Sequence, residues 1–411
     1  MVGEDVLRLK KWDGVFKKSQ VKLPSSKSIA NRALIIQAIA QGVEITNLSS
    51  SKDSQTLQEL IDSKGSILDV GPAGTPYRFL TSLVASTPGW NAELTGSERM
   101  LERPVGELVE ALRGLGADIE YLGEEGCPPL KIRGKALEGG EVRMQARTSS
   151  QFVSSLLLVA PEFSKGLTIV FEEEPISKPY IEMTVQTMIQ FGAEVEWESN
   201  SRLRVSPKPY SAGVIAVESC WSSISYILGL IALGKPNQVL EFEHFFAESS
   251  QGDAAQIKEW KRLGLQFEFG ENNSLKVWKE ELEGDKWGDI NCEDIPDLAQ
   301  TFIAYACFGN KKVALSGLKT LRIKETDRID AMAQELLKCG YHVGTGAEHL
   351  EFQGGKSEVT TMPRIATYHD HRVAMAMAFG VAVLPEIEIE NPNVVVKSFP
   401  HFWEELEALL Y

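Results

Sequence analysis

The sequence has few cysteines, and they form no recognisable pattern. There are five, Cys127, Cys220, Cys292, Cys307 and Cys339, an odd number with no C-x-x-C spacing. A disulfide framework is typical of short secreted chains with an even set of cysteines, and a zinc site needs closely spaced ligands. The cysteines therefore indicate a protein of the reducing cytoplasm, and they suggest neither disulfides nor a metal.

The sequence also lacks a long apolar run. Its longest apolar stretch, about residues 373–384, is too short to cross a bilayer and is typical of a buried helix. Residues 1–12 mix charged with apolar side chains, which is not the apolar core of a secretion signal. We therefore expect neither a membrane role nor export.

The sequence has fewer basic than acidic side chains. The chain carries 42 Lys and Arg against 57 Asp and Glu, a formal net charge of −15. This excess of negative charge repels nucleic acid and anionic lipid, so neither is an expected partner. An anionic small-molecule substrate would need local clusters of Lys and Arg that overcome the overall field at short range.

What the sequence does contain is an internal repeat. With 411 residues the chain is long enough for two domains. Four segments share a helical run that ends in glycine and continues as an alternating strand, at Gly116, Gly192, Gly264 and Gly340, with spacings of 76, 72 and 76 residues. Glycine suits the left-handed residue that ends a helix. A repeat of this length is typical of a small α/β subdomain used several times.

A fifth, degenerate copy precedes these four. Its glycine is Gly65, only 51 residues before Gly116. The first repeat is therefore shorter than the others by about 25 residues. The shortening falls between Gly65 and Gly71 and predicts the loss of a strand or loop.

Five expected helix starts carry side chains that can bind anions. These are Lys27, Ser28 and Arg32 behind a Ser25 or Ser26 cap; Gly74 and Arg78 around Thr75 as cap; Ser149, Ser150 and Gln151; Ser177 and Tyr180 around Pro179; and Lys324, Glu325 and Arg328. Free backbone amides and the helix dipole favour an anion at such places. Taken singly, each is explained as well or better by an ordinary cap, turn or surface ion pair.

Further candidates lie in the second half of the chain. Asp297 stands near a helix start, residues 370–372 read Asp-His-Arg, and Lys397 precedes a helix begun by Pro400. His369 and His371 would share a face only on a strand, and no third ligand is evident. We therefore expect no metal site.

Together and in this order, these signals resemble the 5-enolpyruvylshikimate-3-phosphate synthase (3-phosphoshikimate 1-carboxyvinyltransferase) family. The segments that carry the resemblance are SSKSIANRAL, PAGTPYRFL, RMLERPVGELVEALRGLGADI, SSQFVSSLLL, SKPYIEMT, RIKETDR, DHRVAMA and KSFPHFWEEL. The resemblance implies a two-domain inside-out α/β barrel, each domain of three βαβαββ repeats, here with the first repeat shortened. Residues 24–217 would form one domain and residues 1–23 and 218–411 the other, with the active site in the interdomain cleft.

The resemblance also implies substrates and site residues. The substrates would be shikimate 3-phosphate and phosphoenolpyruvate, with no cofactor, and the protein would be a monomer. By position, the residues that resemble the shikimate 3-phosphate site are Lys27, Ser28, Arg32, Ser149, Ser150, Gln151, Ser177, Tyr180, Asp297 and Lys324. Those that resemble the phosphoenolpyruvate site are Lys27, Gly74, Arg78, Arg103, Gln151, Arg328, His371, Arg372 and Lys397. The many arginines fit, because a planar guanidinium binds carboxylate and phosphate bidentately.

The implied reaction needs groups that both give and accept protons. The 5-hydroxyl of shikimate 3-phosphate would attack C2 of phosphoenolpyruvate while the methylene carbon is protonated, and the tetrahedral adduct would then expel phosphate. We assign Glu325 to the methylene carbon, Asp297 to the hydroxyl and Lys27 to the departing phosphate.

Several residues depart from the family pattern. Pro72 replaces an asparagine, Thr320 stands where the family has a substrate-contacting asparagine, and Lys52 aligns with an aspartate. Phe79 follows Arg78 where many relatives have proline. Sensitivity to glyphosate, which Gly74 implies by resemblance, therefore stays open.

Two alternatives stay open. One is UDP-N-acetylglucosamine enolpyruvyl transferase, which is disfavoured because SSKS replaces its Lys-Asn start and because no cysteine lies in the loop before RMLERP. The other is a catalytically silent relative that binds anions. The shortened repeat favours it, whereas the retained Asp297, Lys324, Glu325 and Arg372 oppose it.

Overall fold

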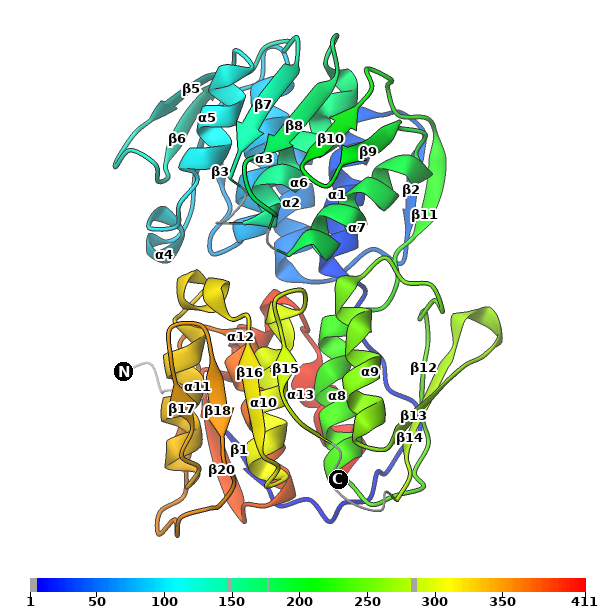
Figure 1. Ribbon diagram of the computed structural model, residues 1–411, viewed down its shortest axis with the longest axis vertical. Helices are drawn as coiled ribbons and strands as arrows, with labels where there is room; N and C mark the ends of the chain where they lie inside the picture. The colour runs from blue at the N-terminus through cyan, green and yellow to red at the C-terminus, as the bar shows by residue number, and fades with distance from the viewer. Residues whose placement is uncertain (1–5, 146–148, 176, 282–286) are drawn as a thin grey trace. The chain divides into compact units, whose positions relative to one another are not determined.

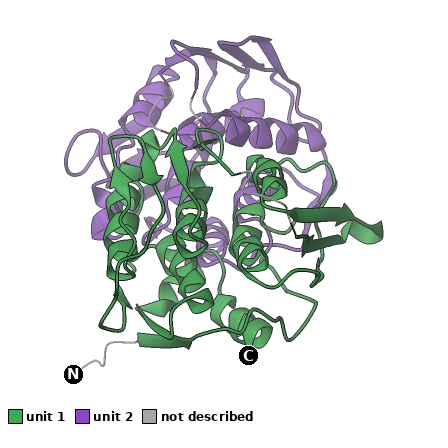
Figure 2. Cartoon of the chain, turned by 60° about the horizontal axis from the view of Figure 1, so that its bottom comes forward, with its two compact units in different colours: residues 1–24, 218–411 green, residues 25–217 purple. Residues whose placement is uncertain are grey.

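The computed structural model describes residues 6–145, 149–175, 177–281 and 287–411 (Figure 1). The chain divides into two compact units, one of residues Ser25–Val217 and one of Met1–Pro24 with Glu218–Tyr411 (Figure 2). Each unit is mixed α/β and encloses its own cluster of buried apolar side chains. Among the described residues, none of the helices combines the length and apolarity that a membrane crossing requires.

Two four-stranded sheets of the unit Ser25–Val217 share one topology. The first contains β3 (Ile67–Asp69), β4 (Asn91–Thr95), β6 (Leu130–Arg133) and β5 (Asp118–Tyr121), in that order. The second contains β7 (Gly140–Met144), β8 (Leu167–Phe171), β10 (Arg202–Val205) and β9 (Val195–Ser199). In each, the first two strands are parallel and the last two form an antiparallel hairpin. Each sheet with its helices therefore forms one βαβαββ repeat.

The third sheet of this unit has only two strands, β2 (Val43–Thr46) and β11 (Gly213–Ala216), which are parallel. Helix α2 (Lys52–Ser63) follows β2, and β3 begins at Ile67. The interval leaves no room for the hairpin that completes the other two repeats. The predicted shortening of the first repeat is confirmed, and the missing part is a whole two-stranded hairpin.

The helices of this unit supply most of its core. They are α1 (Lys27–Ile39), α3 (Gly74–Ser86), α4 (Glu98–Leu101), α5 (Gly106–Gly114), α6 (Ser150–Val159) and α7 (Lys178–Gln190). Helices α3 and α6 are buried along nearly their whole length. Serines join them, since Ser82 Oγ lies 2.6 Å from Ser155 Oγ, which donates to the Arg78 carbonyl. Buried polar groups are thus satisfied inside the helical layer.

The described residues of the other unit form three sheets. Their strand orders are β1 (Val6–Lys10), β20 (Glu386–Glu390), β19 (Arg364–Ile365); β12 (Leu240–Phe242), β14 (Leu275–Lys279), β13 (Leu265–Phe269); and β15 (Ile290–Asn291), β16 (Val313–Ser316), β18 (Leu350–Phe352), β17 (Gly344–Thr345). Strand β1 pairs antiparallel with β20, with Val6 opposite Glu390. The N-terminal strand therefore completes a sheet made from the C-terminal part of the chain.

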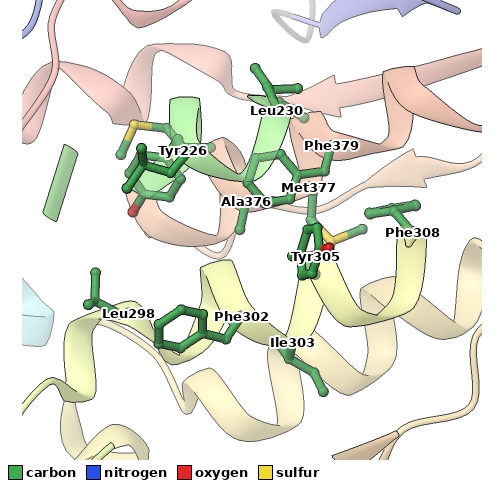
Figure 3. Packing of buried hydrophobic residues seen from close by; sticks show 14 of the residues in the cluster. Tyr226, Leu230, Leu298, Phe302, Ile303, Tyr305, Phe308, Ala376, Met377 and Phe379 are labelled. Atoms are coloured by element: carbon green, nitrogen blue, oxygen red, sulfur yellow. The ribbon is translucent and has the colours of Figure 1, made fainter. Parts of the chain in front are cut away.

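The helices of this unit are α8 (Trp221–Leu233), α9 (Gln256–Arg262), α10 (Ala299–Phe308), α11 (Arg328–Lys338), α12 (His371–Met377) and α13 (Phe402–Leu410). Helices α8, α10 and α12 are apolar on almost every side, which is typical of helices inside a core. Tyr226 and Leu230 of α8, Phe302 of α10, Ala376 of α12 and Phe379 just after α12 all belong to one buried apolar cluster (Figure 3). The apolar run near residues 373–384 was expected to be one buried helix; it is largely buried, but α12 ends at Met377 and a 3-10 helix, Ala378–Ala382, follows it.

The four repeat glycines end their helices as predicted. Gly116, Gly192, Gly264 and Gly340 have φ of 93°, 82°, 90° and 89°. Each follows the C-terminal residues of α5, α7, α9 or α11, where a left-handed residue closes the helix. The degenerate copy differs, because Lys64 with φ 44° takes the left-handed position after α2 in place of Gly65.

Candidate active site

An ion-pair network joins several helix starts in the unit that contains residues 218–411. Arg328 begins α11 and is 1% exposed. Its guanidinium donates to Asp370 Oδ2 at 2.7 Å, to Asp297 Oδ1 at 3.0 Å and to Glu325 Oε2 at 2.9 Å. Three segments that are far apart in sequence therefore meet at one buried cation.

Two further cations complete this network. Arg372 Nη2 donates to Asp297 Oδ2 at 2.7 Å, and Lys397 Nζ donates to Glu325 Oε1 at 2.7 Å. Asp297 and Glu325 are thus each held by Arg328 and by a second positive group. The structure brings together five residues that the sequence predicted in four separate segments: Asp297, Glu325, Arg328, Arg372 and Lys397.

The charges set the protonation of Asp297. Burial by itself raises the pKa of this carboxyl, but Arg372, Lys324 and Arg328 outweigh it and hold the pKa well below its usual range. Asp297 is therefore a carboxylate at neutral pH. Similarly, burial lowers the pKa of Arg328, whereas Asp370, Glu325 and Asp297 together raise it above the ordinary value. Arg328 therefore stays charged beside ionised Asp297.

Local structure explains how α12 presents its residues. Asp370 caps the helix by accepting from the Arg372 backbone N–H at 2.8 Å. It also accepts from Arg328, so this carboxylate both starts α12 and ties it to α11. His371 follows the cap and is 2% exposed. His369 lies outside the helix with a left-handed backbone, so the two histidines do not share a strand.

In the other unit, the start of α1 carries Lys27. Ser26 caps the helix by accepting from the Ile29 N–H, as one of the two expected caps. Lys27 Nζ lies 3.0 Å from Asp53 Oδ2, and the Asp53 side chain is only 4% exposed. The Lys52 side chain, which aligned with a family aspartate, is 59% exposed and points elsewhere. Lys27 therefore has a carboxylate beside it. This carboxylate is Asp53, one residue after Lys52, the position that resemblance had aligned with the family aspartate.

Arg32 lies inward from the same helix. Its guanidinium donates to Thr184 Oγ1 at 2.7 Å, to Ser154 Oγ at 3.1 Å and to the carbonyls of Ser28 at 2.7 Å and Tyr180 at 2.9 Å. Burial lowers its pKa to about 10. Arg32 thus links α1 to α6 and α7 and fixes the backbone of Ser28 and Tyr180, two other predicted site residues.

Helix α3 begins beneath two arginines. Its first residue is Gly74 and its N-cap is Ala73, so Thr75 is not the cap that the sequence suggested. Arg78 Nη1 donates to the Gly74 carbonyl at 2.9 Å. A Cβ built on Gly74 would lie 2.7 Å from Arg78 Nη1 and 2.5 Å from Arg103 Nη1. Glycine is therefore required for two guanidinium groups to lie this close to a helix start.

The remaining predicted residues occupy the starts of α6 and α7. Ser149 caps α6 by accepting from the Gln151 N–H at 3.2 Å, and Ser150 is 7% exposed. Ser177 precedes α7 with φ 53°, a left-handed conformation that is rare for serine. The carbonyl of Tyr180 accepts from Arg32. Apart from Arg103, which follows α4, the predicted residues of this unit lie at or within the first two turns of α1, α3, α6 and α7, and Arg32 joins three of those helices.

The predicted site residues form two groups, one in each unit. Residues Lys27, Ser28, Arg32, Gly74, Arg78, Arg103, Ser149, Ser150, Gln151, Ser177 and Tyr180 belong to one, and Asp297, Lys324, Glu325, Arg328, His371, Arg372 and Lys397 to the other. In the part of the chain that the structure describes, no three His, Cys, Asp or Glu side chains are arranged to hold a metal ion. Both groups have the chemistry of anion sites.

Comparison with known proteins gives the family. The family model for EPSP synthase (3-phosphoshikimate 1-carboxyvinyltransferase) matches residues 54–406. A 3-phosphoshikimate 1-carboxyvinyltransferase of Bacteroides fragilis is 41% identical, with 95% of this chain and 94% of the relative covered. One of Nitrosomonas europaea is 34% identical, with 95% and 96% covered.

Solved structures agree in fold. The EPSP synthase of Acinetobacter baumannii superposes with a TM-score of 0.76 at 22% sequence identity, and the superposition covers 98% of each chain. The curated relatives align with 95% of this chain, and the family model spans the predicted site residues from Gly74 to Lys397. The chain belongs to the EPSP synthase (3-phosphoshikimate 1-carboxyvinyltransferase) family.

Proposed function

We propose that the protein transfers the enolpyruvyl group of phosphoenolpyruvate to the 5-hydroxyl of shikimate 3-phosphate, releasing phosphate, as a step of the shikimate pathway. One observation carries the proposal beyond family membership. Asp297 and Glu325 are each held between two cations in a single buried network. Two carboxylates and several cations are what proton transfer between anionic substrates requires.

Asp297 is proposed to accept the proton of the 5-hydroxyl as its oxygen attacks C2. In the unliganded protein the pKa of Asp297 is held too low for an efficient base by Arg372, Lys324 and Arg328. An anionic substrate beside these cations would offset their charge and raise the pKa of Asp297 toward the range of a useful base. Substrate binding would thereby activate the base.

Glu325 is proposed to deliver a proton to the methylene carbon and to take one back when phosphate leaves. Its carboxylate is bound to Arg328 and Lys397 in the absence of substrate. A phosphate or carboxylate of phosphoenolpyruvate would compete for the same cations. Lys27 is proposed to assist the departing phosphate, and Asp53 is proposed to hold the Lys27 ammonium in place.

The other predicted residues are proposed to bind the two substrates. Phosphoenolpyruvate would contact Gly74, Arg78, Arg103, Gln151, Arg328, His371, Arg372 and Lys397 together with Lys27. Shikimate 3-phosphate would contact Ser28, Arg32, Ser149, Ser150, Gln151, Ser177, Tyr180, Asp297 and Lys324 as well as Lys27. Arg32 would act chiefly by fixing Ser28 and Tyr180, since its guanidinium is occupied by protein acceptors. The proposal requires that both units contribute to one active site.

The finer architecture is part of the same proposal. Each unit would be an inside-out α/β barrel, and the protein would act in the cytoplasm as a monomer. The βαβαββ repeats of the unit Ser25–Val217 and the solved relative of the same fold support the barrel architecture. Size-exclusion chromatography with light scattering would reveal a dimer by twice the 45.4 kDa chain mass.

The test is phosphate release by the purified protein with phosphoenolpyruvate and either of two acceptors. We expect release with shikimate 3-phosphate and none with UDP-N-acetylglucosamine. Release only with UDP-N-acetylglucosamine would identify the activity as UDP-N-acetylglucosamine enolpyruvyl transfer instead. No release with either acceptor, combined with measurable binding of shikimate 3-phosphate, would mean that loss of the first-repeat hairpin has left a silent anion-binding relative.

A further inference from the structure

The turn in front of α12 has a strained backbone. Tyr368 and His369 follow one another with φ of 52° and 55°, a left-handed conformation that side chains larger than glycine rarely adopt. Directly after them, Asp370 caps α12, and His371 and Arg372 are the first residues of that helix. Strain of this kind persists only where the surroundings hold the chain in place.

Helix α11 holds this turn at both ends. Its first residue, Arg328, donates to Asp370 at the end of the turn. Seven residues further along the same helix, and so on the same face, Glu335 reaches the beginning of the turn. Glu335 Oε2 accepts from the Ala366 N–H at 3.0 Å, and Glu335 Oε1 accepts from the Tyr368 hydroxyl at 2.6 Å, closer than Gln334 Oε1, which lies 3.0 Å from the same hydroxyl. One helix face thus anchors both ends of the left-handed segment.

Glu335 is built as a buried anchor. Its side chain is 0% exposed, and Lys338 Nζ lies 2.7 Å from Glu335 Oε2 while also donating to the Arg364 carbonyl at 3.1 Å. A buried carboxylate is tolerated only where hydrogen bonds and opposite charge satisfy it, and here a cation, a hydroxyl and an amide do so. Burial of a carboxylate costs free energy. A carboxylate buried at this turn therefore indicates that the turn must keep a defined geometry.

We propose that Glu335 and Tyr368 are positioning residues that hold the strained turn and thereby aim His371 and Arg372 at phosphoenolpyruvate. The inference rests on the proposed function, because it assigns these two side chains to that substrate. Neither Glu335 nor Tyr368 belongs to the network around Arg328, so their effect passes through the backbone of residues 366–370. Loosening the turn should weaken binding of phosphoenolpyruvate without removing any group that takes part in proton transfer.

The first test is Tyr368→Phe, which deletes the hydroxyl and keeps the ring. We expect the KM for phosphoenolpyruvate to rise about five- to tenfold, the effect of one lost hydrogen bond. The KM for shikimate 3-phosphate and kcat should stay within about twofold. The matched control is Tyr341→Phe, the same change at a buried tyrosine that packs edge-on to Phe308 and Phe352. An equal response of both variants, or none in Tyr368→Phe, would overturn the proposal.

The second test separates backbone strain from side-chain contact. His369 is exposed, so its substitution chiefly changes the preference of the backbone. His369→Gly should leave the KM for phosphoenolpyruvate within about twofold, because glycine adopts positive φ freely, whereas His369→Val should raise it because β-branched residues resist this conformation. Equal values for the two variants would contradict the role of the strained turn.

Amide hydrogen exchange tests the inference without substrate. In Tyr368→Phe, exchange at Ala366 and Arg372 should accelerate about five- to tenfold over wild type, while the core of α10 stays unchanged. Unchanged exchange at both amides would overturn the inference even if the enzyme is active. Conversely, accelerated exchange in a protein without turnover would support the anchored turn and reject the proposed function alone.

Discussion

Among the described residues, the most deeply buried arginines of the two units, Arg32 and Arg328, have opposite surroundings. Arg32 is 2% exposed and donates only to hydroxyls and carbonyls, and burial lowers its pKa to about 10. Arg328 is 1% exposed and touches three carboxylates, which raise its pKa despite burial. Arg32 therefore links helices through neutral hydrogen-bond acceptors. Arg328 instead holds three carboxylates, whose ion pairs an anionic substrate would compete for under the proposed function. Under the proposed function, arginine links helices in one unit and holds the two proton-transferring carboxylates in the other.

We expect substitution of Arg328 to reduce stability and turnover more than substitution of Arg32 does. Arg328→Met leaves Asp297, Glu325 and Asp370 without their shared cation, and removing one partner of a buried ion pair costs about 3–5 kcal/mol. We expect turnover to fall below detection and thermal stability to drop strongly. Arg32→Met leaves only neutral acceptors, so its cost should be nearer 1–3 kcal/mol. Thermal unfolding and phosphate release measure both, and equal losses would refute the contrast.

The second prediction concerns Glu325→Gln, which keeps the shape of the network and removes the proton carrier. We expect kcat to fall about 10²- to 10⁴-fold while folding is retained. The control is Glu358→Gln, the same change at an exposed glutamate, which should behave as wild type. Undiminished turnover in Glu325→Gln would remove its assigned role.

The third prediction uses the crowding over Gly74. In Gly74→Ala, the new Cβ would displace the Arg103 and Arg78 guanidinium groups, so the KM for phosphoenolpyruvate should rise about tenfold. The KM for shikimate 3-phosphate should change little. Gly114→Ala is the control, because a Cβ there meets no atom within 4 Å. Similar kinetics of the two variants would show that the arginines move aside freely.

The fourth prediction has the smallest expected effect and concerns the stability of the folded protein at acidic pH. Because the folded-state pKa of Asp297 lies below its unfolded value, its ionised form stabilises the folded protein above about pH 4, and this contribution is lost as the pH falls further. Asp297→Asn should therefore flatten the acid limb of the stability profile. Arg32→Met should leave that limb unchanged, since the Arg32 guanidinium donates to hydroxyls and carbonyls. Chemical denaturation between pH 3 and pH 7 measures both profiles.

Local signals in the sequence predicted much of the fold. The glycines Gly116, Gly192, Gly264 and Gly340 identified the repeat because a left-handed helix end depends on a single residue. The same logic failed at Gly65, where Lys64 adopts that conformation at a steric cost. The shortening near Gly65 was visible from spacing, but whether it removed a loop or a hairpin depended on pairing between strands, which spacing does not contain.

The sequence predicted which residues belong to the candidate site, but it did not predict which of them contact one another. Asp297, Glu325, Arg328, Arg372 and Lys397 were each named from local motifs, yet only the folded chain brings them around one guanidinium. Asp53 was missed because an alignment by resemblance placed its neighbour Lys52 there. Glu335 and Tyr368 gave no signal either, since a glutamate within a polar helix and a tyrosine in a loop are ordinary until the turn they hold is known.

The central claim is that Glu325 protonates the methylene carbon while the acceptor adds to C2. If so, the carbon passes through a methyl group, and the reaction in deuterium oxide must place deuterium in the methylene group of the product. Proton NMR of the product measures this directly. We expect deuterium in the product of the wild-type protein and a lower rate of its incorporation in Glu325→Gln. Product that forms at full rate without deuterium would contradict the account.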